Sequence, residues 1–212
     1  KQKTAYEIYQ CDWSSDVCSS DLMSASLPLV ADQIVDAYDF SQHHCLMDVG
    51  GGQGTFLKRV RTVAPQLNRV LFDLPGVVNL AKENFLNTKE HQDIEVHGGD
   101  FFQDAMPNGA DLITLIRVIF DHDDARVRIL LAAIFAALPA GGKLLIAEPM
   151  ADTSDHPAMG HAYFGFYLLA MGRGRPRTVE EISNLAIEAG FRNIQMLPCS
   201  MPINAQILLV HK

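Results

Sequence analysis

Residues 46–56 read Leu-Met-Asp-Val-Gly-Gly-Gly-Gln-Gly-Thr-Phe, a glycine-rich turn that follows an apolar run and precedes a helix-forming segment. Gly50, Gly52 and Gly54 fall in a G-x-G-x-G spacing, and Asp48 stands just ahead of them. Glycines allow the backbone to turn sharply and to approach a ligand without a Cβ in the way. The helix that follows offers the unpaired N–H groups of its first turn to the same ligand. This stretch therefore predicts a strand, a ligand-binding loop and a helix.

Two further features indicate the kind of ligand. A dinucleotide loop, G-x-G-x-x-G, needs a glycine where this chain has Thr55. The carboxylate of Asp48 would repel a pyrophosphate but attract an ammonium group. A second apolar run, residues 69–73, ends in Asp73, which is placed to accept hydrogen bonds from ribose hydroxyls. The pattern favours S-adenosylmethionine over NAD as the cofactor.

Composition narrows the class of protein. The chain has 212 residues and a formal net charge of −8, and this mildly acidic balance argues against a broad nucleic-acid surface. No apolar run approaches the roughly 18–20 residues of a transmembrane segment, and no signal-peptide pattern or internal repeat is found. We expect a cytoplasmic protein with one α/β domain that acts on a small molecule.

Residues 1–22 are expected not to be native protein. Residues 1–8 and 11–22 can be encoded by the two halves of a common short-read sequencing adapter, so residues 1–22 are set aside as its translation. A disordered polar tail is the alternative. The remaining cysteines, Cys45 and Cys199, form neither a disulfide framework nor a zinc spacing, and no metal is expected. Residues 23–212 are then a single catalytic domain.

Strand and helix patterns alternate along residues 23–212, as in a mostly parallel sheet with helices on both faces. Strands are expected at 45–49, 69–73, 94–98, 111–119, 143–148, 191–198 and 205–211. Helices are expected at 27–38, 54–64, 75–86, 123–138, 158–171 and 178–189. Thr178 and Glu181 would form a capping box at the start of the last helix. The fold class is therefore α/β, a Rossmann-like, doubly wound sheet of seven strands.

Ligands of such sheets lie beyond the carboxyl ends of the strands. The residues expected at these ends are Asp48, Asp73, Asp100, Phe120 and Glu148.

In their order, these segments resemble class I S-adenosylmethionine-dependent O-methyltransferases, and more narrowly the family of caffeate, hydroxyindole and bacterial small-molecule O-methyltransferases. The resemblance rests on residues 48–56, 72–75, 98–102, 121–124, 141–148 and 177–191. It implies methyl transfer from S-adenosylmethionine to a hydroxyl group, with S-adenosylhomocysteine as product and no metal. Members carry an N-terminal winged-helix dimerisation domain, which this chain lacks, so the resemblance implies a homodimer for the full-length protein.

Carried over by position, the resemblance gives roles to the cofactor residues. Gly50, Gly51 and Gly52 would line the methionine part of the cofactor, near Asp48. Asp73 would hold the ribose, and Asp100 with Phe101 would bracket the adenine. Leu74 and Arg117 complete the set of predicted cofactor-binding residues. Asp48 and Asp100 could instead cap a helix or a turn, and Phe101 could be a plain core residue.

The chain departs from the family at the catalytic base. Many members have a histidine after the fourth strand, where this chain has Phe120, and a phenylalanine cannot take a proton. The candidate catalytic residues are therefore Asp121, His122 and Glu148. Glu148 could orient a substrate hydroxyl or bond the neighbouring loop, and His122 could be a residue of the helix start. A second family carboxylate is lost at Pro176.

These substitutions, with residues 171–178, resemble the carotenoid O-methyltransferases of phototrophic bacteria. That branch methylates a tertiary hydroxyl of hydroxyneurosporene-type pigments, so the resemblance implies a carotenoid substrate of membrane origin and a protein that is cytoplasmic or peripheral to the membrane. Phe120, Phe164 and Tyr167 would then line an apolar substrate pocket, although residues 162–169 could equally be a core helix. An aromatic or polyketide O-methyltransferase is the first alternative. A non-catalytic S-adenosylmethionine-binding regulator is the second.

Overall fold

The computed structural model of the chain describes residues 16–86, 93–151, 174–202 and 204–212, and side chains in α2 from residue 27 onward. Within these residues the backbone forms one seven-stranded sheet in the order β3-β2-β1-β4-β5-β7-β6. The strands are β1 Cys45–Val49, β2 Asn68–Asp73, β3 Ile94–Gly98, β4 Leu112–Ile116, β5 Lys143–Glu148, β6 Arg192–Leu197 and β7 Gln206–His211. Strands β1 to β5 are parallel, and β7 lies antiparallel between β5 and β6. The prediction of an α/β, mostly parallel sheet is confirmed.

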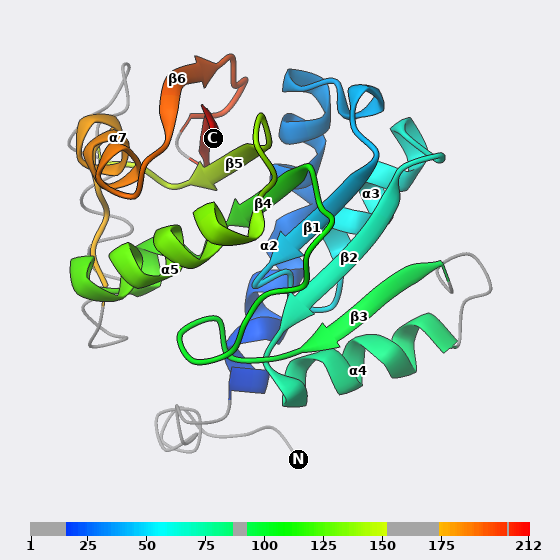
Figure 1. Cartoon of the computed structure of the whole chain (residues 1–212). Coiled ribbons are helices and arrows are strands. Elements are labelled where there is room, and N and C mark those ends of the chain that lie inside the picture. Colours follow the sequence, from blue (N-terminus) through cyan, green and yellow to red (C-terminus); the bar gives the residue numbers. More distant parts are fainter. Residues whose placement is uncertain (1–15, 87–92, 152–173, 203) are drawn as a thin grey trace.

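Helices cover both faces of the sheet (Figure 1). The α-helices are α2 Asp16–Ala37, α3 Thr55–Val63, α4 Pro75–Leu86, α5 Asp124–Ala137 and α7 Val179–Glu188. Two short 3₁₀ helices, η1 Phe40–Gln42 and η3 Ile119–Asp121, join them to the strands. The capping box that opens α7 is formed by Thr178 and Glu181, as predicted. The helix predicted at 158–171 lies outside the described residues.

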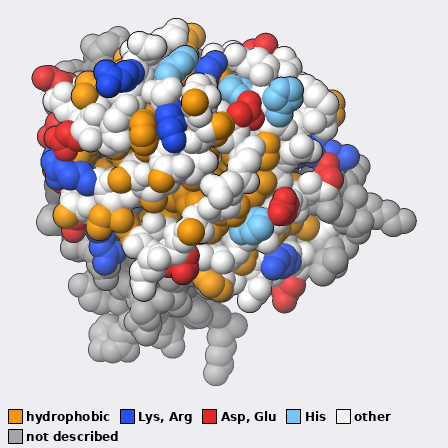
Figure 2. Space-filling view, in the orientation of Figure 1, with side chains coloured by type: hydrophobic (Ala, Val, Ile, Leu, Met, Phe, Trp, Pro, Cys, Tyr) orange, Lys and Arg blue, Asp and Glu red, His pale blue; other side chains and the backbone are white. Residues whose placement is uncertain are grey.

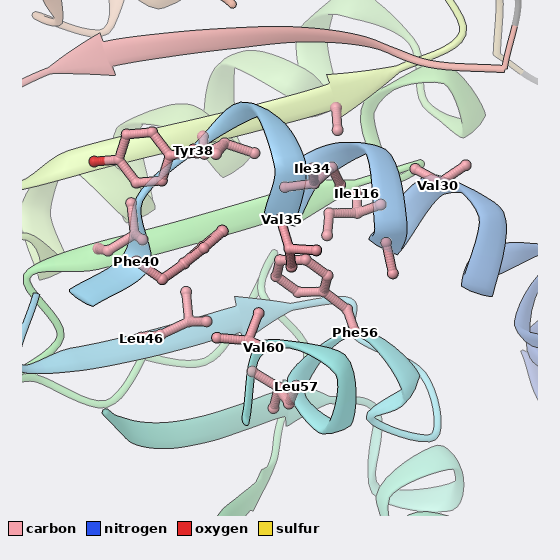
Figure 3. Packing of buried hydrophobic residues seen from close by; sticks show 14 of the residues in the cluster. Val30, Ile34, Val35, Tyr38, Phe40, Leu46, Phe56, Leu57, Val60 and Ile116 are labelled. Carbon is pink, nitrogen blue, oxygen red and sulfur yellow. The ribbon is translucent and has the colours of Figure 1, made fainter. Parts of the chain in front are cut away.

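Two hydrophobic layers separate the helices from the sheet. On one face, side chains of α2, α3 and α4 pack on the strands, and Figure 3 shows those of α2 and α3 directed toward one another. On the other face, side chains of α5 and α7 pack on the same strands. Neighbouring residues of β1 and β5 alternate between the layers: Leu46 and Leu145 face the first, and Met47 and Leu144 face the second. Each fully buried side chain of this size contributes about 1.5–3 kcal/mol to the free energy of folding. A shift of one residue in a strand would move these side chains to the opposite face, so the two layers fix the register of the sheet.

Two predicted boundaries were wrong. The strand expected over 111–119 ends at Ile116, because Arg117 has a left-handed backbone with φ of 56° and the chain then enters η3. Phe120 therefore lies in a 3₁₀ turn rather than at a strand end. The first helix was expected at 27–38 and instead begins at Asp16, within the segment set aside as adapter-derived.

A polar network closes the amino-terminal edge of the sheet. Asp111 accepts hydrogen bonds from the backbone N–H groups of Cys45 (2.7 Å) and His44 (3.1 Å), and its other oxygen lies 2.9 Å from Nδ1 of His43. The other ring nitrogen of His43 lies 2.7 Å from the Tyr38 hydroxyl. This network joins the start of β4 to the start of β1 and to the end of α2, so it sets where the two central strands begin.

The network makes stability depend on pH. Burial lowers the pKa of His43 despite its bond to Asp111. Burial alone would raise the pKa of Asp111, but hydrogen bonds from Cys45, His43 and His44 outweigh it and hold that pKa below its ordinary value. Both shifts are downward, so the stabilisation is complete above the ordinary pKa of histidine, about 6.5, and is lost as the pH falls.

We expect Asp111→Asn to lower the free energy of unfolding at pH 7.5 by about 2 kcal/mol, because a charged acceptor of several hydrogen bonds is lost. Urea denaturation at pH 7.5 and at pH 4.5 measures the change, which should be smaller at the lower pH. Asp36→Asn, at an exposed position of α2, is the matched control and should leave stability unchanged. An Asp111→Asn variant as stable as the parent at pH 7.5 would contradict the network's role.

Candidate active site

The carboxyl edge of the parallel strands carries three buried acids. Asp48 lies near the end of β1, and Asp73 and Glu148 are the last residues of β2 and β5. Their exposed fractions are 1%, 8% and 1%. A buried carboxylate is costly unless hydrogen bonds compensate it, so the partners of these three groups define the candidate site.

The glycine loop follows β1 as the sequence predicted. Gly50, Gly52 and Gly54 all have positive φ, and Gly54 immediately precedes α3. Gly51 has to be glycine for a different reason, because a Cβ there would lie 2.4 Å from Oδ2 of Asp48 and 2.6 Å from Cδ1 of Leu71. The loop thus lies directly on the Asp48 carboxyl group.

Asp48 is held beneath this loop rather than at the surface. Its Oδ1 accepts a 2.6 Å hydrogen bond from the hydroxyl of Thr114 on β4. Its Oδ2 has no hydrogen-bond partner among the described residues. Burial, and to a lesser degree the charge of Asp73, raises the pKa of Asp48 to about 7. A cation placed above the loop would favour the ionised form.

Asp73 connects the loop to the next helix. Oδ2 accepts a 2.7 Å hydrogen bond from the N–H of Gly52, and Oδ1 accepts a 2.7 Å bond from the N–H of Leu74. The carbonyl of Leu74 in turn accepts the N–H groups of Val77 and Val78 in the first turn of α4. Each carboxylate oxygen keeps acceptor capacity for a further donor, such as a ribose hydroxyl.

The turn after β3 brings Asp100 and Phe101 to the same edge. Asp100 accepts hydrogen bonds from the N–H of Phe102 (2.9 Å) and the side-chain amide of Gln103 (2.6 Å), so its carboxylate stabilises the turn. Phe101 is partly exposed, and its ring lies 4.6 Å from that of Phe102 and 5.8 Å from that of His122, edge to face in both cases. His122 also meets the ring of Phe102, at 5.0 Å. Phe101, Phe102 and His122 therefore form one aromatic cluster, which puts His122 beside a candidate adenine-binding residue.

Glu148 organises the segment between β4 and α5. Its Oε1 accepts hydrogen bonds from the N–H groups of Val118 (2.8 Å) and Ile119 (2.7 Å), and its Oε2 has no partner among the described residues. Burial raises the pKa of Glu148 to about 8, although its backbone hydrogen bonds act in the opposite direction. Loop bonding, one of the two predicted roles for Glu148, is thus present, and one oxygen remains for a second role.

Phe120 and Asp121, two further candidate residues, lie in η3. Phe120 is 2% exposed. Asp121 is partly buried, and its Oδ1 is a buried atom without a partner within the described part of the chain. Burial raises the pKa of Asp121 to about 7. Asp123 accepts the N–H of Arg126 and so begins α5.

Sequence reasoning missed Arg177, which secures this whole segment. Its guanidinium group is 1% exposed and donates to the carbonyls of Ile119 (2.9 Å) and His122 (2.7 Å) and to Oδ1 of Asp124 (2.7 Å). Arg177 directly precedes the capping box of α7, and that position was the available signal. The carbonyls on both sides of Asp121 are thereby fixed.

The structure brings most of the predicted site residues to one edge of the sheet. Asp48, the glycine loop, Asp73, Leu74, Asp100, Phe101, Arg117, Asp121, His122 and Glu148 lie at or just beyond the carboxyl ends of the strands. Phe164 and Tyr167 lie outside the described residues.

No cluster of three or more potential metal ligands occurs in the part of the chain that the structure describes. None of the described helices is long and apolar enough to span a membrane. Figure 2 shows hydrophobic side chains toward the middle of one face and many of the charged side chains around its rim.

Comparison with known sequences places this geometry in context. Residues 3–192 match a family model described as an O-methyltransferase domain. The chain is 41% identical over 175 residues to the demethylspheroidene O-methyltransferase of Rhodobacter capsulatus, which covers 82% of this chain and 43% of that protein. It is 36% identical over 162 residues to the acetylserotonin O-methyltransferase of Bos taurus, which covers 76% of this chain and 46% of that protein. The chain spans about half the length of the curated relatives it matches.

Solved structures agree with the fold. Human N-acetylserotonin methyltransferase in complex with SAM matches with a TM-score of 0.81 at 27% identity, over 92% of this chain and 55% of that chain. The mitomycin 7-O-methyltransferase matches with a TM-score of 0.85 at 27% identity, over 99% of this chain and 61% of that chain.

The buried guanidinium group of Arg177 allows a direct test. Arg177→Met should lower the free energy of unfolding by about 3 kcal/mol, because Asp124 and two backbone carbonyls lose a buried charged donor. Arg175→Met is the matched control: its side chain is 45% exposed and pairs with the same Asp124 and with Glu181. A surface pair contributes at most about 1 kcal/mol. Equal losses for the two variants in urea denaturation would show that Arg177 has no special structural role.

Proposed function

The chain belongs to the O-methyltransferase family, and from this premise we propose that it transfers a methyl group from S-adenosylmethionine to a hydroxyl oxygen of an apolar small molecule. As the substrate we propose a carotenoid, methylated at a tertiary hydroxyl. The chain spans about half the length of the curated relatives it matches, so the activity of the whole protein is part of the proposal.

The residues at the sheet edge fit S-adenosylmethionine. The unpaired, buried Oδ2 of Asp48 and the glycine loop above it suit a cationic amino acid group held close to the backbone. Asp73 would accept the ribose hydroxyls while it holds Gly52, and Phe101 would contact the adenine. When bound, S-adenosylmethionine supplies an electrophilic methyl group on a sulfonium sulfur. The SAM complex of human N-acetylserotonin methyltransferase, with the same fold, supports this assignment.

Phe120 carries the choice of substrate. It stands where the family resemblance predicts a histidine base, and it is buried in η3 beside the candidate site. An apolar residue there suits a hydrocarbon substrate with an aliphatic hydroxyl, which is far less acidic than a phenol, so its proton has to leave during attack on the methyl group and not before it. Positioning the oxygen and excluding water then become the main contributions of the protein. The 41% identity to a demethylspheroidene O-methyltransferase supports this reading.

An aromatic hydroxyl is the second candidate. The 36% identity to an acetylserotonin O-methyltransferase favours it, and His122 would be the base. However, the ring of His122 packs edge to face against both Phe101 and Phe102, an arrangement that suits a structural role at the cofactor side.

Partners and location follow from the carotenoid proposal. Carotenoids reside in membranes, so we place the protein in the cytoplasm with access to a membrane surface. For the full-length protein we propose a homodimer, on the family resemblance alone.

The role of Asp73 predicts the affinity for S-adenosylmethionine. Asp73→Ala should weaken binding by about a hundredfold, because hydrogen bonds to a charged acceptor, each worth about 1.5–3 kcal/mol, are lost. Calorimetry with the full-length protein gives the dissociation constant, and circular dichroism checks that the fold is retained. Asp32→Ala, at an exposed acid of α2, is the control. Unchanged affinity in Asp73→Ala would remove Asp73 from the cofactor site.

The substrate is tested by transfer of a labelled methyl group from S-adenosylmethionine. We expect methylation of a hydroxylated carotenoid and not of N-acetylserotonin. Phe120→His should not raise turnover of the carotenoid alcohol and should lower it, since a polar group against hydrocarbon costs on the order of 1–3 kcal/mol. Methylation of N-acetylserotonin and not of the carotenoid would favour the aromatic hydroxyl as the substrate. S-adenosylmethionine binding without transfer to any alcohol would indicate a regulatory protein.

A further inference from the structure

Two carboxyl oxygens near Phe120 are buried without a hydrogen-bond partner. They are Oε2 of Glu148 and Oδ1 of Asp121, and neither has a partner among the described residues. Native proteins pair nearly all buried polar atoms, so two unpaired acid oxygens at one edge of the sheet need an explanation. Neither is accounted for by the roles assigned so far to the cofactor residues.

Glu148 is held in one orientation. Both backbone N–H groups, of Val118 and Ile119, donate to the same oxygen, Oε1. These two bonds hold the carboxyl group against the start of η3. The bonded residues immediately precede Phe120 and Asp121 in the chain, which puts the end of β5 against η3.

Asp121 is held by its flanking carbonyls. Arg177 donates to the carbonyl of Ile119 on one side and of His122 on the other. In addition, the N–H of Asp121 donates to the carbonyl of Val118. The backbone of Asp121 is therefore fixed by η3 and by a buried cation, and Asp121 cannot leave the edge without disrupting both.

The two acids influence each other. Burial raises the pKa of both groups, to about 7 for Asp121 and about 8 for Glu148, and the charge of Asp121 adds to the shift of Glu148. Ionisation of one carboxyl group therefore disfavours ionisation of the other.

Other charged groups lie on the elements around the two acids. Arg175 and Arg177, from the segment before α7, both pair with Asp124 of α5. Arg117 precedes η3, and the ring of His122 faces Phe101 and Phe102.

We propose that Asp121 is the proton acceptor of the methyl transfer, with the neutral carboxyl group of Glu148 as its partner. This inference rests on the proposed function. The O–H bond of the substrate breaks and its proton passes to Oδ1 of Asp121. An electron pair of the hydroxyl oxygen forms the new C–O bond with the methyl carbon, and the pair of the broken S–CH₃ bond remains on sulfur as a thioether. Asp121 then releases the proton to water.

This arrangement explains why the site tolerates Phe120. A carboxylate in a buried environment, with a pKa close to the working pH, is a more effective general base than the same group in water. Protonation of Glu148 is essential, because a second negative charge beside Asp121 would repel the developing alkoxide. Glu148 is then a positioning residue for Asp121 and for η3.

The test compares Asp121→Asn and Glu148→Gln in the full-length protein with S-adenosylmethionine saturating. Asp121→Asn should slow turnover of the carotenoid alcohol about 100-fold or more, the usual contribution of a general base. The rise of wild-type turnover with pH, through the Asp121 pKa of about 7, should disappear. Glu148→Gln, which imitates the protonated acid, should retain most of the turnover at pH 7. Asp123→Asn, an exposed acid two residues along for which asparagine is an equally good helix cap, is the control.

Infrared difference spectroscopy supplies a readout that does not depend on turnover. The carbonyl stretch of protonated carboxylic acids should be present at pH 7, and comparison with Glu148→Gln should identify a component that belongs to Glu148 and vanishes as the pH rises past about 8. Its absence from the wild type at pH 7, or a normal pH profile in Asp121→Asn, would overturn the acid pair while leaving the methyltransferase proposal intact. A wild-type protein that methylates no alcohol would overturn the proposed function, and this inference with it.

Discussion

The bond between Glu148 and the backbone N–H groups of Val118 and Ile119 is the constraint on which the candidate site depends. It forces the chain out of β4 after Ile116 and into η3, so that Phe120 and Asp121 lie against the end of β5. Without an internal acceptor these amides would be buried and unpaired, at a cost of about 1–3 kcal/mol each. A carboxyl group at the end of one strand thus determines the shape of the loop that follows the neighbouring strand.

The same principle recurs along this edge of the sheet. Asp73 holds the glycine loop and the start of α4, and Arg177 holds η3 to the segment before α7. In each case a buried charged group bonds backbone groups of a loop, and Arg177 also bonds the side chain of Asp124. Such groups make the loops rigid, and rigid loops can hold a cofactor and a hydroxyl group in line. They also leave specific oxygens unpaired, on Asp48, Asp121 and Glu148.

Family membership and local chemistry answer different questions about this protein. Membership in the O-methyltransferase family rests on matches that extend over most of the chain. The substrate depends on a few positions, of which Phe120 is the most informative, because its ring cannot exchange a proton. A demethylspheroidene O-methyltransferase and an acetylserotonin O-methyltransferase both match the chain, so substrate choice has to be argued from the residues around η3.

Much of the fold was determined by sequence alone. The period of the apolar residues located the strands and most helices, and the glycine spacing with Asp48 and Asp73 indicated the edge of the sheet at which we propose the cofactor, because these are local properties of short segments. The end of β4, the burial of Arg177 and the unpaired oxygens of Asp121 and Glu148 were decided only by the tertiary structure. They depend on contacts between residues far apart in the chain, such as Glu148 with Val118 and Arg177 with Ile119, and no local pattern encodes which distant group a buried charge will meet.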